Sequence, residues 1–114
     1  MITVNRILTL AAAGLLAVSA NTALAKGNVE AGKAKAAQVC ASCHGADGNK
    51  PTSPDFPILA GQHADYLVKA LQDYKSGKRN NPIMKGFASG LSTKEMEDLG
   101  AFFASQPSGL KSAR

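Results

Sequence analysis

The segment Cys40-Ala41-Ser42-Cys43-His44 constrains this chain more than any other feature. It holds the only two cysteines of the sequence, three positions apart, and one of its two histidines. C-x-x-C-H is the attachment signature of a c-type haem, because two cysteines on one helical turn can each form a thioether to the same porphyrin. The adjoining histidine is then placed to bind the iron. The segment predicts one haem c, held covalently through Cys40 and Cys43, with His44 as an iron ligand.

Two other kinds of site use the same pair of cysteines, a redox disulfide and half of a zinc site. Zinc would need further ligands, and the chain offers only His44 and His63 besides the two cysteines. A thioredoxin-like disulfide should lie in a strand-rich βαβ pattern, and the sequence shows none. The histidine at position 44 and the export signal described next favour haem over both.

Residues 1–25 have the features of a cleaved secretory signal peptide. Arg6 supplies a positive start, residues 7–18 are apolar and uncharged, and Ala23-Leu24-Ala25 fits a small-x-small cleavage site. The apolar run is shorter than the roughly 18–20 residues that span a bilayer as a helix. An uncleaved anchor is the alternative. We expect a mature domain of residues 26–114, exported to the periplasm without stable membrane insertion.

The mature part of the chain is enough for one small domain. It contains all eight acidic residues and twelve of the thirteen basic ones, so its net charge is +4. There is no tryptophan, and four phenylalanines with two tyrosines are a thin supply for a core. A chain this short usually needs a disulfide, a metal or a large cofactor. We therefore expect haem to stabilise the fold and the haem-free chain to be largely unfolded.

The hydrophobic periodicity is helical, with connectors rich in glycine, proline and asparagine. Capping residues and helix stops predict three main helices. They run from the cap Asn28 to Cys40, from about His63 to Ser76, and from the capping box Ser92-Thr93-Lys94-Glu95 to Pro107. Residues 45–61 are predicted to be a long loop, and residues 79–90 a turn-rich connector. The expected fold is all-α, with long loops wrapped around one covalently bound haem.

The iron needs a sixth ligand, and we predict Met84. It lies on the expected irregular connector, where a thioether can be held toward a metal. Met96 lies on the apolar side of a predicted helix and is assigned to packing. His63 would give a bis-histidine site, but it opens a helix and is expected to face solvent. An open sixth position is the remaining alternative. Methionine sulfur favours ferrous iron and raises the reduction potential.

The chain resembles the class I cytochromes c, of the small monohaem bacterial type that is similar to the single domains of dihaem periplasmic cytochromes c. The residues that carry the resemblance are Cys40 to Gly45, Gly48-Asn49, Phe56 to Gln62, Tyr66, Ser76 to Arg79, Met84, and Leu91-Ser92 through Phe102. The resemblance implies that His44 and Met84 are the axial ligands. It also implies that the Pro57 carbonyl accepts a hydrogen bond from the outer nitrogen of His44, and that Gly32 lets the first and last helices cross near Phe102.

Function is predicted from an iron with both axial positions filled by protein. No substrate reaches such a metal, and no carboxylate pair or activated nucleophile lies near the motif, so we expect no enzyme and no catalytic residues. The expected function is a one-electron carrier cycling between Fe(III) and Fe(II). Alternatives are a haem-bearing subunit of a larger dehydrogenase or oxidase complex, and a haem enzyme or gas sensor with an open iron.

The expected partners are redox proteins with acidic docking surfaces, steered by lysines around the haem edge. Nucleic acid is not expected, because the chain is exported and lacks a pattern of aromatic and basic residues. Arg79 is a candidate partner for a haem propionate.

Overall fold

The computed structural model describes residues 26–108 together with Gly14 and Leu110. The five helices of this part are α1 (Val29–Val39), α2 (Ala41–His44), α3 (Ala64–Ser76), α4 (Pro82–Ser89) and α5 (Thr93–Ala104). The described residues contain no strand, so the prediction of an all-α fold is confirmed. Apart from Gly14, the predicted signal peptide, residues 1–25, lies outside the described residues. None of the described helices is long and apolar enough to cross a membrane.

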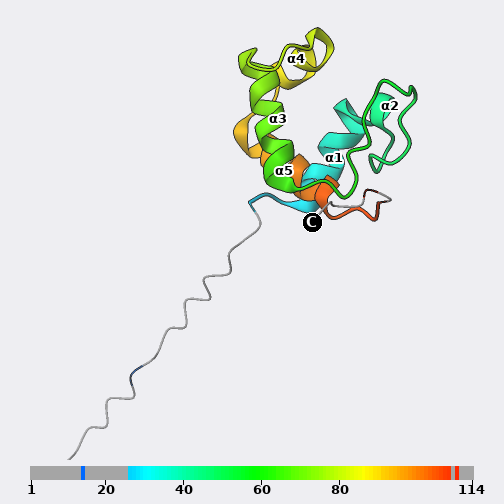
Figure 1. Ribbon diagram of the computed structural model, residues 1–114. Helices are drawn as coiled ribbons and strands as arrows, with labels where there is room; N and C mark the ends of the chain where they lie inside the picture. The colour runs from blue at the N-terminus through cyan, green and yellow to red at the C-terminus, as the bar shows by residue number, and fades with distance from the viewer. Residues whose placement is uncertain (1–13, 15–25, 109, 111–114) are drawn as a thin grey trace, which may run out of the picture.

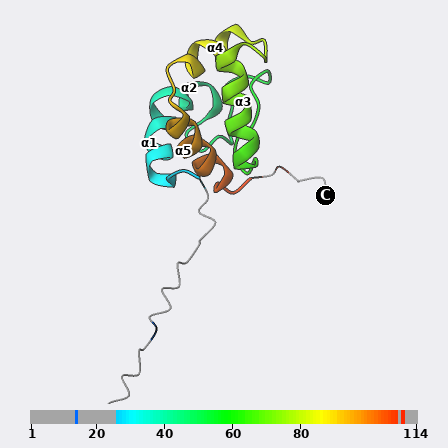
Figure 2. The same ribbon diagram turned by 90° about the vertical axis from the view of Figure 1, so that its left-hand side faces the viewer.

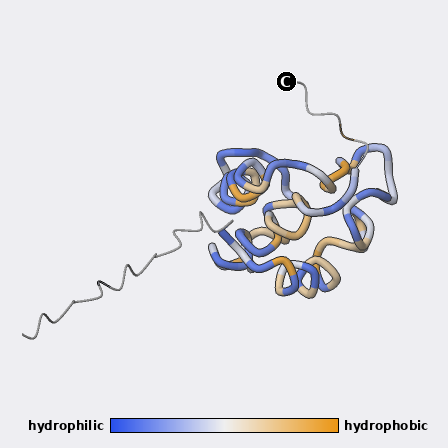
Figure 3. The backbone as a smooth tube through the Cα atoms, turned by 90° about the horizontal axis from the view of Figure 1, so that it is seen from below, coloured by the Kyte–Doolittle hydropathy of each residue, from blue (hydrophilic) through white to orange (hydrophobic). Residues whose placement is uncertain are grey.

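The helices form two arms, α1 with α2 and α3 with α4, and α5 joins them. On one side α4 packs against α3, and on the other α2 follows and contacts α1. Figure 2 shows α5 between α1 and α3, and both helices pack against it. Figure 3 shows hydrophilic and hydrophobic stretches within the same helices, as expected for helices that bury one side.

The predicted start of α1, the predicted start of α5 and the predicted end of α3 are confirmed by the structure, whereas α5 ends at Ala104, earlier than the predicted Pro107. The Asn28 side chain accepts from the Ala31 backbone N–H at 2.9 Å and starts α1. Ser92 and Glu95 form the reciprocal capping box of α5, with bonds of 3.1 and 3.0 Å. Helix α3 stops at Gly77, whose φ of +85° is the left-handed conformation that favours glycine.

The prediction of a turn-rich connector over residues 79–90 is wrong for Pro82–Ser89, which form α4. The Asn81 side chain accepts from the Met84 backbone N–H at 3.0 Å, which satisfies one of the free donors at the helix start. Pro82 occupies the first helical position, where its missing N–H costs nothing. Met84 therefore lies in the first turn of a regular helix, not on an irregular connector.

The core lies where α5 meets α1 and α3. Its buried members are Ala36, Leu67, Leu91, Met96, Leu99, Phe102 and Phe103. Met96 is only 2% exposed, which confirms its assignment to packing, and His63 is exposed as expected. Gly32 is buried at the crossing of α1 and α5, and a Cβ there would lie 2.8 Å from the Cβ of Phe102. The close crossing near Phe102 that the resemblance implied is therefore present.

Candidate haem-binding site

The two cysteines lie on one helical turn at the start of α2. The backbone N–H groups of Cys43 and His44 both donate to the Cys40 carbonyl, at 3.2 and 3.0 Å. Residues three apart on such a turn lie on the same side of it, so both thiols are presented to one ligand. Both cysteines are free.

The arrangement of side chains does not favour a zinc site, which would need more ligands than Cys40, Cys43 and His44. Burial raises the pKa of the Cys40 thiol to about 11. The described residues also contain no group of three or more histidine, cysteine, aspartate or glutamate side chains arranged to hold a metal ion.

His44 is held in one orientation by the loop that follows it. Its side chain is 6% exposed, and its Nδ1 lies 2.9 Å from the Pro57 carbonyl oxygen. A carbonyl oxygen only accepts, so Nδ1 carries the proton and donates it. The other ring nitrogen, Nε2, then has its lone pair free for a metal. Such a bond also fixes the ring and raises its basicity as a ligand.

The loop of residues 45–61 brings Pro57 to the histidine because its own backbone is tied down. The Thr52 N–H donates to the Cys43 carbonyl at 3.0 Å, and the Leu59 N–H donates to the Gly48 carbonyl at 2.9 Å. Gly61 then anchors the end of the loop to α5, through a 2.9 Å bond to the Phe103 carbonyl. Described residues in this loop form no helix or strand, as predicted.

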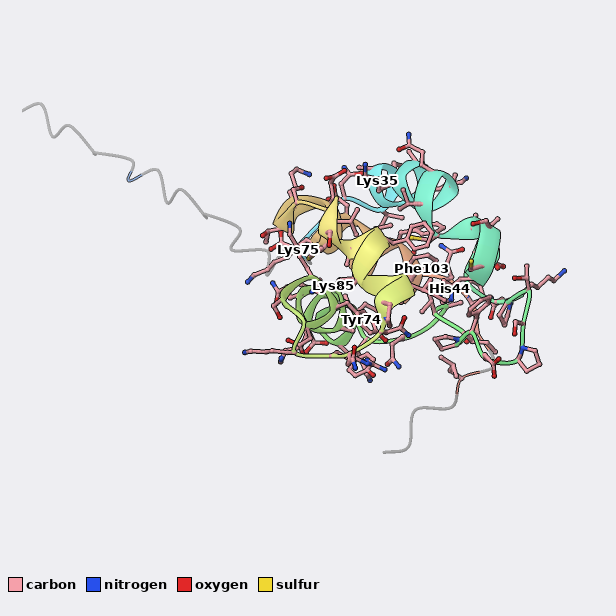
Figure 4. The ribbon with its side chains drawn as sticks, turned by 90° about the horizontal axis from the view of Figure 1, so that it is seen from above. Lys35, His44, Tyr74, Lys75, Lys85 and Phe103 are labelled. Atoms are coloured by element: carbon pink, nitrogen blue, oxygen red, sulfur yellow. The ribbon has the colours of Figure 1, made fainter. Side chains whose placement is uncertain are left out.

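Met84 comes from the opposite arm of the molecule. It is half-buried on α4, which packs against α3, whereas His44 lies on α2 beside α1. The two predicted axial ligands are thus supplied by different arms. Figure 4 shows His44 on the side of Phe103, away from Tyr74 and Lys85 of α3 and α4.

The residues present fit a haem. The core of the described residues is small, and Met96 and Leu99 are its most completely enclosed large side chains. Around the histidine the loop instead offers apolar groups to a ligand. The Phe56 ring lies 6.1 Å from the His44 ring, and Ile58 is 40% exposed. A flat apolar cofactor bonded to Cys40 and Cys43 would cover such groups.

Arg79 is held by two tyrosines of α3. Its guanidinium donates to the Tyr66 hydroxyl at 3.3 Å and lies 4.8 Å from the centre of the Tyr74 ring. Tyr66 is 49% exposed, and Leu67 is the one buried residue of α3. Nothing local in the sequence indicates this arrangement, because it depends on how the chain turns back after α3.

The amino-acid sequence of this chain is similar to those of known proteins. The pattern of the family described as "Cytochrome c" matches residues 29–107. The chain belongs to the cytochrome c family. Cytochrome c4 of Pseudomonas aeruginosa is 48% identical over 103 residues, which cover 90% of this chain and 47% of that protein. A "Thiosulfate dehydrogenase electron acceptor" of Stutzerimonas stutzeri is 44% identical over 78 residues, 68% of this chain and 36% of that protein.

The fold agrees with solved structures of the same family. The crystal structure of reduced recombinant cytochrome c4 from Pseudomonas stutzeri matches with a TM-score of 0.67 at 43% identity, over 74% of this chain and 48% of that one. The chain spans about half the length of the cytochrome c4 proteins it matches. The predictions of a cytochrome c fold and a bound haem c are thereby confirmed for this domain.

Proposed function

We propose that this cytochrome c domain is a one-electron carrier whose haem iron is held by His44 and Met84. The observation that carries the proposal is the hydrogen bond from Nδ1 of His44 to Pro57, because it presents Nε2 as a fixed metal ligand. When bound, haem c supplies a one-electron Fe(III)/Fe(II) couple. With protein ligands on both sides of the iron no substrate reaches it, so the domain acts as a carrier and not as an enzyme.

The chain's own residues hold the cofactor and limit its chemistry. Cys40 and Cys43 would hold the haem covalently through two thioethers. Pro57 keeps the imidazole from rotating. The apolar side chains of the loop exclude water, which penalises the more highly charged ferric form and raises the reduction potential.

Met84 is the best candidate for the sixth ligand among the described methionines. The other one, Met96, is enclosed in the core of α5. Met84 is half-buried, and its backbone is fixed by the cap from Asn81. A soft thioether sulfur suits ferrous iron.

Export to the periplasm is part of the proposal and rests on residues 1–25 of the sequence. Cleavage after Ala25 would leave Lys26 as the first residue. N-terminal sequencing of the protein recovered from a periplasmic fraction tests this, and a chain that still begins at Met1 would contradict it.

A second candidate is an electron-transfer subunit of a larger dehydrogenase or oxidase. It is favoured by the relative named as a thiosulfate dehydrogenase electron acceptor, which covers 68% of this chain. A carrier elutes alone in gentle size-exclusion chromatography of cell extract. Stable co-elution with a larger catalytic protein would instead support the subunit.

Absorption spectroscopy tests the ligands. The ferric protein should show the weak far-red band of methionine ligation, and the ferrous protein should bind carbon monoxide slowly or not at all. Met84→Leu should lose the band and bind carbon monoxide rapidly, whereas Met96→Leu, a volume-conserving core change, should keep the parent spectrum. A parent protein that binds carbon monoxide at once, or a Met84→Leu variant with the parent spectrum, would refute methionine ligation.

A further inference from the structure

The helix that carries Met84 has little packing of its own. Among the described helices, α4 packs extensively only against α3. Ala88 is its one buried residue, and an alanine side chain buries little apolar area. Ile83 and Phe87 of the same helix are 58% and 43% exposed. Packing within the protein part of the molecule therefore anchors α4 weakly.

Hydrogen bonds tie this part of the chain to the rest of the described residues only at its two ends. We call residues 80–90 the methionine segment. Just before it, the Arg79 backbone N–H donates to the Asp73 carbonyl at 3.0 Å. Bonds within the segment are local, such as the one that the Asn81 side chain accepts from the Met84 N–H. The position of the segment against α3 therefore depends on the ties at its ends.

The tie at the far end is made by Lys75, in the last turn of α3. Its Nζ donates to the Leu91 carbonyl at 2.6 Å, and this bond is partly buried. The Leu91 N–H in turn donates to the Ala88 carbonyl, in the last turn of α4, at 3.0 Å. Lys75 thus lies between α3 and the chain that leads into α5, and it holds the residue that closes α4 (Figure 4).

The bond made by Lys75 differs from the usual role of a lysine at this place. A basic residue in the last turn of a helix usually interacts with the dipole of that helix. The Lys75 ammonium instead binds a carbonyl 16 residues further along the chain. The ion pairs of the described residues are made by three other lysines, Lys35, Lys69 and Lys94. A hydrogen bond from a charged donor is stronger than one between neutral groups, so this bond is suited to hold two helices together.

We propose that Lys75 is a positioning residue for the sixth ligand. It holds the end of α4 against α3 and so keeps the Met84 sulfur within reach of the iron. The inference rests on the Met84 ligation proposed above. When the methionine segment swings away from α3, it withdraws this sulfur and leaves the sixth position open. Thioether sulfur favours ferrous iron, so the loss of the tie is felt first in the ferric protein.

Imidazole binding to the ferric, haem-loaded protein measures how often the sixth position opens. A ligand that binds only the open form has an apparent affinity proportional to the open fraction. Lys75→Leu removes the donor and should raise the imidazole affinity by about tenfold. Tenfold corresponds to about 1.4 kcal/mol, close to the lower end of the range for a hydrogen bond to a charged group. Lys75→Arg keeps a charged donor and should stay within about threefold of the parent.

Lys78→Leu is the matched control. Lys78 is exposed in the turn between α3 and α4, and its one hydrogen bond in the described part of the chain is made by its backbone. The control removes the same charge close to the methionine segment but leaves the tie in place, so the imidazole affinity should change less than about threefold. Guanidinium unfolding of each variant, followed by circular dichroism, separates a general loss of stability from the opening of one segment.

Several outcomes would overturn the role of Lys75. Equal gains in imidazole affinity for Lys75→Leu and Lys78→Leu would mean that only the charge matters. An unchanged affinity in Lys75→Leu, even with a lower stability, would leave the lysine a purely structural role. A Lys75→Arg variant that behaves like Lys75→Leu would show that the hydrogen bond is not the cause. Failure of Met84 ligation itself would instead appear in the parent protein, as a ferric spectrum without the methionine band and an imidazole affinity that Met84→Leu does not raise.

Discussion

The crossing of α1 and α5 at Gly32 gives a quantitative prediction for Gly32→Ala. The added Cβ would overlap the backbone of Asp98 on α5, lying 2.6 Å from its carbonyl carbon, and would also touch the Cβ of Phe102. Neither contact is the end of a flexible side chain, so the helices have to separate. We expect the folded protein to be destabilised.

The size of the loss in stability follows from the contacts that are disturbed when α1 and α5 move apart. Overpacking of this kind costs about 1–3 kcal/mol. Moving α1 away also strains the 2.8 Å bond from the Asn28 N–H to the Asp98 carboxylate, and a hydrogen bond to a charged group contributes roughly 1.5–3 kcal/mol. Alanine has a higher helix propensity than glycine, which offsets up to about 1 kcal/mol of this loss. The expected net loss is roughly 2–4 kcal/mol, which lowers the melting temperature of a domain this small by roughly 8–30 °C.

Gly86→Ala is the matched control. Gly86 also lies inside a helix, α4, but no other side chain or distant backbone atom comes within 4 Å of its added Cβ. The same substitution should therefore stabilise the protein by about 0.5–1 kcal/mol. Thermal unfolding of the two haem-loaded variants, followed by circular dichroism, measures both effects. A Gly32→Ala variant that melts at or above the parent temperature would refute the packing argument.

Two further predictions concern pH and the cofactor. The pKa of the Asp98 carboxyl is lowered mainly by its hydrogen bond from the Asn28 backbone N–H, and to a smaller extent by Lys94. The carboxylate therefore stabilises the fold fully above about pH 4, the pKa of an aspartate in the unfolded chain. This contribution is lost as the pH falls through the lower pKa that Asp98 has in the folded protein. Asp98→Asn should lower the free energy of unfolding by roughly 1–2 kcal/mol at pH 7. In guanidinium unfolding, the difference in this free energy between variant and parent should shrink near pH 3. A difference independent of pH would contradict the role of the Asp98 charge. Chain expressed without haem attachment should show little helical circular dichroism and no cooperative melting, because the protein core alone is small; a helical, cooperatively melting haem-free chain would show that the cofactor is not needed for folding.

The sequence predicted the features that local chemistry determines. The C-x-x-C-H turn, the cap Asn28 and the capping box at Ser92 each depend on residues within four positions, and all are present in the structure. Helix α4 was missed although Asn81-Pro82 is a regular helix start, because asparagine and proline are equally typical of turns.

Contacts between distant residues could not be predicted from local patterns. Asn28 and Asp98 are 70 positions apart, and their hydrogen bond forms only after α1 packs on α5. The bond between His44 and Pro57 and the close approach at Gly32 were expected only through the resemblance to class I cytochromes c. The stacking of Arg79 on Tyr74 depends on the turn after α3 and had no signal at all.

The most direct test of the account is a spectroelectrochemical titration of the haem-loaded protein, with absorption recorded between the fully oxidised and fully reduced states. A carrier whose iron is closed by His44 and Met84 should give a single reversible one-electron transition with isosbestic points, and a ferric spectrum of histidine–methionine ligation throughout. Two transitions, a transition that is not one-electron, or a ferric spectrum without methionine would contradict a carrier closed by His44 and Met84.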